Sequence, residues 1–310
     1  MTWKYYETVK VKNKEIKGLK DKFSITSDIL SFQTCKRQYG YFAIRKYQPA
    51  HIVQIWYGTI IHQVLDKLHM HYNGLLDPNN KGLPTNDDVD SYFTKVENSL
   101  NAKGIRPLTK NVKDTALRVL QIFNRIEGEL LYPNIKDTEC KLQTDMKDFI
   151  MHGVVDVLKD TTVTNQIKGY ENVEIWDYKG TKFPDTQTDA GKRKFQNYVL
   201  QLMVYAQLYK EKFDNYPLKG VLYFTNELNV NPEPIRRPGS ATYEIDFRDP
   251  YNIERMENSL EKFTEIVDKI KECKVLDRWD APQLIPDAET CNICDIRWDC
   301  PKVNYKMRYP

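Results

Sequence analysis

Two aspartates and a lysine are the residues in this sequence best suited to carry out chemistry. Asp156 ends the apolar stretch Gly-Val-Val-Asp, and Asp177 and Lys179 lie two apart in Ile-Trp-Asp-Tyr-Lys-Gly, so on a strand their side chains leave the same face. Carboxylates hold Mg²⁺ or Mn²⁺, the metal polarises a phosphate and acidifies a bound water, and a neighbouring cation orients that water or stabilises the developing charge. The pattern favours phosphodiester hydrolysis, although a D-x-K triplet on a strand is also common by chance.

Residues downstream of the aspartates could assist the same chemistry. Gln201 and Tyr205 are four apart in a stretch expected to be helical, so they share a face and could reach a phosphate or a base beside the metal. Lys192, Arg193 and Lys194 place positive charge near the start of that helix, which suits contact with a phosphate backbone. A core tyrosine and a solvated charged turn are the structural alternatives.

His62 is a further candidate ligand. It lies within the stretch 56–72, and Asp66 follows it by one helical turn. An imidazole ligand would favour Mn²⁺ over Mg²⁺ because nitrogen donors suit transition metals better. Most histidines fill the surface or the core, and we interpret His69 and His71 in that way.

The cysteines indicate a second metal site. Three of the six form a C-x₂-C-x₅-C motif: Cys291, Cys294 and Cys300. Three thiolates are one ligand short of a tetrahedral zinc site or an iron–sulfur cubane, and Cys35 is the favoured fourth. Cys140 and Cys273 are interpreted as buried free thiols. Spacing alone favours zinc and an iron–sulfur cluster equally, and either would link the two ends of the chain.

The elements that must position these residues follow from hydrophobic periodicity. Ser27 or Asp28 suits the N-cap of the first helix, and Asp249 followed by Pro250 suits the start of the last. Apolar residues at helical spacing predict helices over 29–44 and 56–72, two within 88–132, one over 191–213 and one from 250 onward. Short alternating runs predict strands within 140–160 and over 172–180, 220–227 and 241–247, with 161–171 as a hairpin connection.

The order of these elements predicts an α/β fold, with a central mixed β-sheet flanked by helices and a helical insertion. The strand–helix–strand unit over 172–225 should be a right-handed crossover with parallel strands. We divide the chain into an N-terminal arm (1–23), a helical region with Cys35 and His62 (24–145), a core (146–248) and a C-terminal helix with the cysteine tail (249–310).

Composition limits the classes of protein. A net charge of +3 excludes a uniformly basic surface, so nucleic acid would have to contact a local patch. The N-terminus lacks the apolar region of a secretory signal, and the apolar stretch 52–61 is too short to span a bilayer, so we expect a cytoplasmic protein with no membrane partner. In that compartment cysteines are reduced or bind metal. No Walker A motif is present, so the sequence contains no motor of its own.

Taken together, these motifs resemble the iron–sulfur-containing RecB-like nucleases of the PD-(D/E)XK superfamily, which include the AddB nuclease domain and the CRISPR-adaptation nucleases. The resemblance extends from about Ile25 to Pro301 and follows the family's order of cysteine, G-x-x-x-H, G-x-x-D, D-Y-K, Q-x-x-x-Y and cysteine trio. The matching residues are Cys35, Gly58 to His62, Gly153 to Asp156, Asp177 to Lys179, Gln201 with Tyr205, and Cys291, Cys294 and Cys300. Gly180 stands where relatives often have Thr or Ser.

The resemblance implies a restriction-endonuclease-like core with an iron–sulfur clamp, a [4Fe–4S] cluster on the four cysteines, and a longer helical insertion. It implies His62, Asp156, Asp177 and the backbone carbonyl of Tyr178 as ligands of Mg²⁺ or Mn²⁺, and Lys179 as the catalytic cation. Gln201 and Tyr205 would position DNA or Lys179. The implied activity is a single-strand-preferring DNA exonuclease or end-processing nuclease in repair, recombination or defence, with a helicase supplied by another protein. The alternative is a catalytically silent DNA-binding or scaffold subunit.

Overall fold

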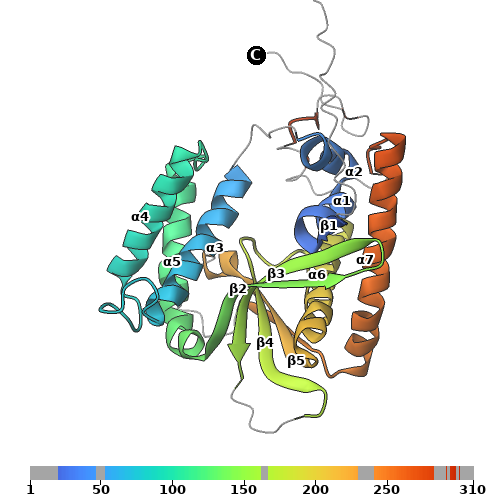
Figure 1. Ribbon diagram of the computed structural model, residues 1–310. Coiled ribbons are helices and arrows are strands. Elements are labelled where there is room, and N and C mark those ends of the chain that lie inside the picture. The colour runs from blue at the N-terminus through green and yellow to red at the C-terminus, as the bar shows by residue number, and fades with distance from the viewer. Residues whose placement is uncertain are drawn as a thin grey trace, which may run out of the picture.

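A mixed β-sheet between two layers of helices forms the framework of the protein (Figure 1). The computed structural model describes residues 20–46, 53–161, 167–229, 241–282, 291, 294–297 and 300. The predicted α/β class, with a central mixed sheet flanked by helices, is confirmed. Within these residues, none of the helices is both long and apolar enough to cross a membrane.

The sheet has six strands, and β3 is its most connected member. β3 pairs antiparallel with β2 along most of its length, parallel with β1 over its first residues and antiparallel with β4 over its last. β4 then pairs parallel with β5, which pairs antiparallel with β6. The predicted parallel pairing across the strand–helix–strand unit is therefore confirmed. The strands are β1 (Asp21–Ser24), β2 (Ile135–Asp145), β3 (Phe149–Asp160), β4 (Tyr170–Lys179), β5 (Tyr216–Phe224) and β6 (Thr242–Asp246).

Each face of the sheet carries its own hydrophobic core because successive side chains of a strand point to opposite faces. On β4, Val173 and Ile175 join one core, and Trp176 and Tyr178 join the other. The first core lies under α6 (Asp189–Phe213) and α7 (Pro250–Leu276). The second lies under three helices: α3 (Val53–Tyr72), α4 (Asn86–Ala102) and α5 (Lys110–Leu131). A short helical turn, η4 (Thr225–Asn229), follows β5, and another, η3 (Tyr132–Asn134), precedes β2.

The N-cap of the first helical segment lies earlier in the chain than predicted. The segment starts as η1 (Ile25–Leu30) with Ser24 as the N-cap, so the assignment of the cap to Ser27 or Asp28 was wrong. Both of those residues nevertheless contact the cap: Ser27 N donates to the Ser24 hydroxyl, and Ser24 N donates to Asp28 Oδ2 at 2.7 Å. The helical segment begins directly after Ser24 because β1 pairs with β3 as far as that residue, which fixes where the chain leaves the sheet.

The continuous helix expected over 29–44 is interrupted. Cys35 has extended backbone angles, with φ of −160°, and separates α1 (Ser31–Thr34) from α2 (Lys36–Gln38). After α2 the chain continues as η2 (Tyr39–Ile44). The expected N-cap at Asp249 is confirmed, since its side chain accepts from Tyr251 N.

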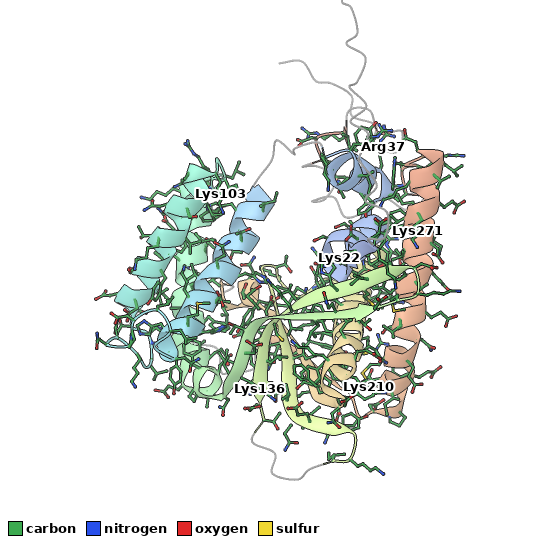
Figure 2. The ribbon with its side chains drawn as sticks, in the orientation of Figure 1. Lys22, Arg37, Lys103, Lys136, Lys210 and Lys271 are labelled. Atoms are coloured by element: carbon green, nitrogen blue, oxygen red, sulfur yellow. The ribbon has the colours of Figure 1, made fainter. Side chains whose placement is uncertain are left out.

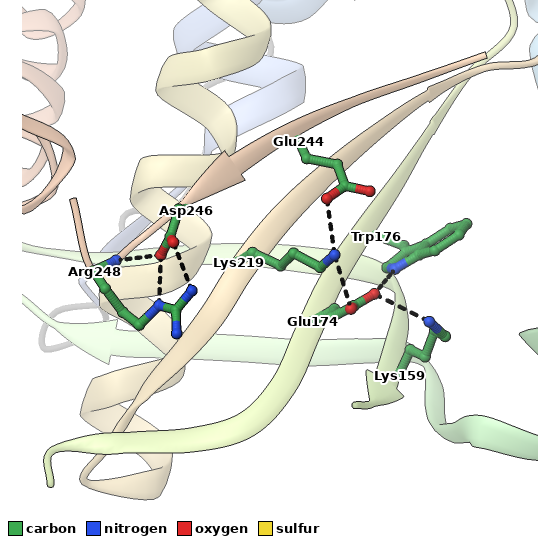
Figure 3. Close-up of polar contacts among 7 residues, drawn as sticks. All are labelled: Lys159, Glu174, Trp176, Lys219, Glu244, Asp246 and Arg248. Carbon is green, nitrogen blue, oxygen red and sulfur yellow. Dashed lines mark hydrogen bonds and ion pairs between the residues drawn. The ribbon is translucent and has the colours of Figure 1, made fainter. Parts of the chain in front are cut away.

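Charged residues also lie within the sheet, on the face opposite α6. Glu174 is 5% exposed, and its carboxylate contacts Lys159 and Lys219 at 3.2 Å each and accepts from Trp176 Nε1 at 2.8 Å (Figure 3). Lys219 is shared with Glu244 on β6. A buried carboxylate is tolerated only when it is paired in this way. Basic residues are otherwise spread over the sheet and both helical layers, as the labelled side chains in Figure 2 show.

The segment after α7 packs back on the N-terminal helical segment. Trp279 is 5% exposed and lies against Tyr39, with ring centroids 5.9 Å apart. A Cβ at Gly40 would lie 2.2 Å from Trp279 Cγ, so only glycine permits this approach. Arg45 and Asp277 form an ion pair of 3.1 Å across the same contact. Residues near both ends of the chain are thus held together.

Candidate active site

The two predicted aspartates lie on neighbouring strands near the point where those strands separate. Asp156 is on β3 and Asp177 on β4, and the ladder between these strands ends at the pair Val157 and Trp176. Beyond that pair, Tyr178 N donates to Asp156 Oδ2 at 2.6 Å. The Asp156 carboxylate thus takes the place of the backbone carbonyl that would accept this hydrogen bond if the ladder continued. The site therefore forms where the end of the ladder leaves room between the two strands.

Lys179 is held by two partners. Its Nζ lies 2.5 Å from Asp177 Oδ2 and donates to Gln201 Oε1 at 2.7 Å. The Gln201 amide nitrogen donates to Asp177 Oδ1 at 2.7 Å and to the Tyr205 hydroxyl at 2.9 Å. Asp177, Gln201 and Tyr205 are each 2–3% exposed, and burial together with nearby Asp156 raises the pKa of Asp177 to about 6, even though Lys179 lowers it. Gln201 therefore fixes the position of Lys179 relative to Asp177.

His62 reaches the site from the opposite helical layer. It lies on α3, and its Nδ1 is 3.3 Å from Asp156 Oδ1. Burial lowers the pKa of His62, but the Asp156 carboxylate offsets this and raises it to about 9. A metal ion at this position would have to displace that proton. His69 and His71 are each 2% exposed, so they fill the core as expected.

Glu139 on β2 is a site residue that the sequence analysis missed. It stands between Thr138 and Cys140, whose partners on β3 are Val157 and Val155, so it lies opposite Asp156. Ligand atoms of His62, Glu139 and Asp156 all lie within 4.8 Å of one another. Two carboxylates directly opposite on paired strands repel, and a bound cation would remove that cost. Glu139 is therefore a candidate ligand in addition to the predicted set.

The backbone explains why Glu139 faces the site. Its φ of 49° is in the left-handed region, which a non-glycine residue seldom adopts. Regular alternation would place Thr138 and Cys140 on one face. Instead, Thr138 Oγ1 donates to Asp66 on α3 at 3.0 Å, whereas Cys140 lies in the core under α6. The left-handed residue thus changes the direction of the strand beside Asp156.

The remaining predicted residues lie on α6 and β4. Lys192, Arg193 and Lys194 are in the first turns of α6, and Lys192 is exposed. Farther along the same helix, the Tyr198 ring lies 4.5 Å from Lys179 Nζ. The Tyr178 carbonyl remains a predicted ligand, and the Tyr178 side chain lies in the core under α3 and α5.

Gly180, which departs from the family pattern, lies against α3. A Cβ at Gly180 would come within 3.4 Å of the Tyr57 ring and 3.6 Å of Gly58 Cα. Its carbonyl accepts from Asn226 Nδ2 at 3.1 Å. Both Cβ distances are ordinary van der Waals contacts, so the structure gives no steric reason for glycine at this position.

The cysteines from the two ends of the chain come together. Cys35 and Cys294 are 8% and 9% exposed. Burial raises the pKa of the Cys35 thiol, backbone hydrogen bonds at residues 38 and 37 lower it, and the proximity of Cys294 and Cys300 raises it. Cys294 N donates to Cys291 O at 3.2 Å. Residue 35 thus lies near Cys294 and Cys300, and its role as the fourth ligand stays a prediction.

The other two cysteines differ from each other. Cys140 is 3% exposed on β2, and burial raises its pKa to about 11. Cys273 is only partly buried, so the expectation that both are buried was wrong for Cys273, which lies near the exposed end of α7. Neither forms a disulfide within the described residues.

Comparison with known proteins identifies the family. The model of the PD-(D/E)XK nuclease superfamily matches residues 24–301, and the chain belongs to that superfamily. Among solved structures, it is similar to a protein named "Putative exonuclease" from Eubacterium rectale, with 12% identity, a TM-score of 0.47, and coverage of 94% of this chain and 90% of that one. It is also similar to the protein SSO0001, with 14% identity, a TM-score of 0.29, and coverage of 68% and 79%. The search of curated proteins found no match.

Gly153 of the G-x-x-D motif packs against Tyr205 of the Q-x-x-x-Y motif, and a substitution at Gly153 can test whether this contact positions Lys179. A Cβ at Gly153 would lie 2.5 Å from Tyr205 Cε1, so Gly153→Ala should displace Tyr205 and, through Gln201, Lys179. We expect DNA cleavage to slow by roughly tenfold to a hundredfold, since small misplacements at a catalytic group have effects of this size. Single-turnover rates on labelled DNA would measure the loss.

Gly58→Ala is the matched control for this prediction. A Cβ at Gly58 would meet nothing within 4 Å, so this change should leave the cleavage rate near that of the wild type. Thermal melting of both variants would separate misplacement from unfolding. A folded Gly153→Ala protein that cleaves DNA at the wild-type rate would contradict the proposal that Gly153 positions Lys179 through Tyr205 and Gln201.

Proposed function

We propose that the protein is a metal-dependent DNA nuclease that hydrolyses phosphodiester bonds, with a preference for single strands and action at DNA ends. Membership of the PD-(D/E)XK superfamily supports nuclease activity. The observation that carries the proposal is the convergence of Asp156, Asp177 and His62 around one site, with Lys179 held beside Asp177 by Gln201. A scaffold that only bound DNA would not require this arrangement.

The donor set suits a hard divalent cation. Asp156, Glu139 and His62 place carboxylate and imidazole atoms within 4.8 Å of one another, and Asp177 lies on the adjacent strand. We propose that these four residues, with the Tyr178 carbonyl, hold Mg²⁺ or Mn²⁺. The histidine favours Mn²⁺. When bound, such a cation supplies Lewis-acid polarisation of the phosphate.

The side chains of this chain would then have distinct roles. Lys179 supplies a fixed positive charge at the position where negative charge develops on the phosphate, and such preorganised charge needs no rearrangement during the reaction. Asp177 and Gln201 keep the ammonium group in place. Tyr205 positions Gln201 through its hydroxyl. Since Gln201 and Tyr205 are 2% exposed, their burial favours positioning of Lys179 over direct contact with DNA.

We further propose that Cys35, Cys291, Cys294 and Cys300 hold a [4Fe–4S] cluster, with Zn²⁺ as the alternative occupant. The support is the closeness of Cys35 to Cys294 and Cys300 across most of the chain length. A cluster would hold the N-terminal helical segment against the segment after α7, where Trp279 already packs on Gly40. We assign the protein to cytoplasmic DNA repair, recombination or defence, with unwinding supplied by a separate helicase.

A time course on end-labelled single- and double-stranded DNA tests the nuclease proposal. We expect cleavage with Mn²⁺ and Mg²⁺, faster on single strands, and none after chelation. A ladder that shortens progressively from one end would show exonuclease action and its polarity. If the protein binds DNA but does not cleave it under any metal condition, the alternative hypothesis of a catalytically silent scaffold subunit would be favoured.

A further inference from the structure

A group of aromatic side chains lies beside Lys179 on the α6 face of the sheet. Phe183 and Tyr198 contact the buried ring of Phe224, and Phe195 and Tyr243 contact Phe183; we call Phe183, Phe195, Tyr198 and Tyr243 the aromatic platform. Phe183 lies 5.1 Å from both Phe195 and Phe224, and Phe195 lies 4.8 Å from Tyr243, measured between ring centroids. The Tyr198 and Phe224 centroids are 6.1 Å apart. The platform residues thus come from three segments (the loop after β4, α6 and β6) and are joined through the buried ring of Phe224 on β5.

This surface is open to solvent, unlike a core. Phe183 is 39% exposed and Tyr243 is 38% exposed, and Phe195 and Tyr198 are partly exposed. Leaving large rings in water forgoes the stabilisation that burial would give, and contiguous exposed apolar surface commonly marks a binding site. Only Phe224, at 1% exposure, belongs fully to the core.

The platform begins at the catalytic site. Lys179 Nζ lies 4.5 Å from the centroid of the Tyr198 ring, and Lys179 pairs with Phe224 across β4 and β5. Phe183 follows Lys179 by four residues, and its backbone N–H donates to Glu227 Oε1 at 2.9 Å, which fixes the loop beside the site. A chain bound at Lys179 could therefore continue directly over the rings.

The segment that carries Phe183, Phe195 and Tyr198 is rich in basic residues, although the Glu227 carboxylate contacts the Phe183 backbone. Between residues 179 and 198 there are five basic residues (Lys179, Lys182, Lys192, Arg193 and Lys194) and two acidic residues (Asp185 and Asp189). Lys182 and Lys192 are exposed. Flat aromatic faces combined with surrounding cations match a polymer of planar bases on a phosphate backbone.

We propose that the aromatic platform stacks unpaired bases of a nucleic acid strand whose phosphate lies at Lys179. Every base has a π-face, so stacking tolerates any sequence, and in a duplex those faces are already covered by neighbouring bases. The platform therefore supplies a physical cause for single-strand preference. Its location relative to the cleaved phosphate rests on the nuclease function proposed above, whereas the stacking itself does not.

Binding measurements with and without bases test this proposal. Labelled single strands and matched abasic strands, which keep the phosphates but lack bases, would be titrated into the full-length Asp177→Asn protein so that the strand stays intact. Phe183→Leu and Tyr243→Leu, each added to this background, should weaken binding of the normal strand by about tenfold and leave the abasic strand unaffected. Phe183→Trp should restore binding.

The control is Tyr251→Leu. Tyr251 is 66% exposed on the first turn of α7, at the opposite end of β6 from Tyr243, so its loss should not change binding. Wild-type protein in chelator provides a second background in case Asp177→Asn does not fold, and melting temperatures identify variants that lose binding by unfolding.

The outcomes separate the two proposals. Equal weakening on normal and abasic strands, equal weakening on blunt duplex, or no weakening would each overturn the stacking proposal even if the enzyme cleaves DNA. Ring-dependent binding of single strands without any cleavage would uphold the platform and overturn the nuclease function.

Discussion

Asp177→Asn should slow DNA cleavage by at least about a thousandfold, which corresponds to roughly 4 kcal/mol of lost transition-state stabilisation. The substitution keeps the shape of the side chain but removes the charge that would hold the metal and that pairs with Lys179 Nζ at 2.5 Å. Single-turnover rates with saturating Mn²⁺ would measure the effect. The loss should persist at higher metal concentration, because the position of Lys179 is disturbed as well.

Asp148→Asn is the control for this prediction. Asp148 is an exposed carboxylate in the turn between β2 and β3, so its neutralisation should leave the rate unchanged. A folded Asp177→Asn protein that degrades DNA as fast as the wild type would place the activity elsewhere, and the scaffold reading would then be preferred.

Cys35→Ser should remove the bound iron or zinc and lower the melting temperature by roughly 10 °C. A metal that joins residue 35 to residues 291–300 closes nearly the whole chain into a loop, and losing such a cross-link is expected to cost about 4 kcal/mol. Metal analysis and absorbance of protein prepared without oxygen would distinguish the [4Fe–4S] cluster from Zn²⁺.

Cys273→Ser is the matched control for the cysteine site. This thiol is only partly buried on α7 and is outside the proposed ligand set, so metal content and melting temperature should stay close to wild type. Unchanged metal content in Cys35→Ser would show that residue 35 is not a ligand.

The sequence predicted much of the site because the relevant residues are close together along strands and helices. Asp177 and Lys179 share a face of β4, and Gln201 and Tyr205 share a face of α6, as their spacing required. The sequence could not show the orientation of the Gln201 side-chain amide, whose oxygen accepts from Lys179 and whose nitrogen donates to Asp177. That choice depends on contacts between separate elements.

Glu139 was missed for a different reason. Cys140 and Leu142 alternate regularly into the core, so a strand pattern assigns no special role to the residue before them. Its approach to His62 and Asp156 depends on the register of β2 against β3 and on one left-handed residue. A register drawn from the apolar residues of both strands would have placed Glu139 opposite Asp156.

The aromatic platform could not be predicted from the sequence either. Its residues come from the loop after β4, from α6 and from β6, and only the sheet order brings them together. The abundance of aromatic residues was visible, at 12% of the chain, but most of the tyrosines and phenylalanines could equally have filled a core.

The contact between Gly40 and Trp279 affects the order of events during synthesis. A ribosome releases Asp156, Asp177 and Lys179 about a hundred residues before Trp279 and the cysteine trio, so the sheet centre can form while the partner of the N-terminal helical segment is still inside the ribosome. Cys35 is therefore synthesised more than 250 residues before Cys291, Cys294 and Cys300. If these four cysteines hold a metal as proposed, it can be loaded only after the cysteine trio has left the ribosome.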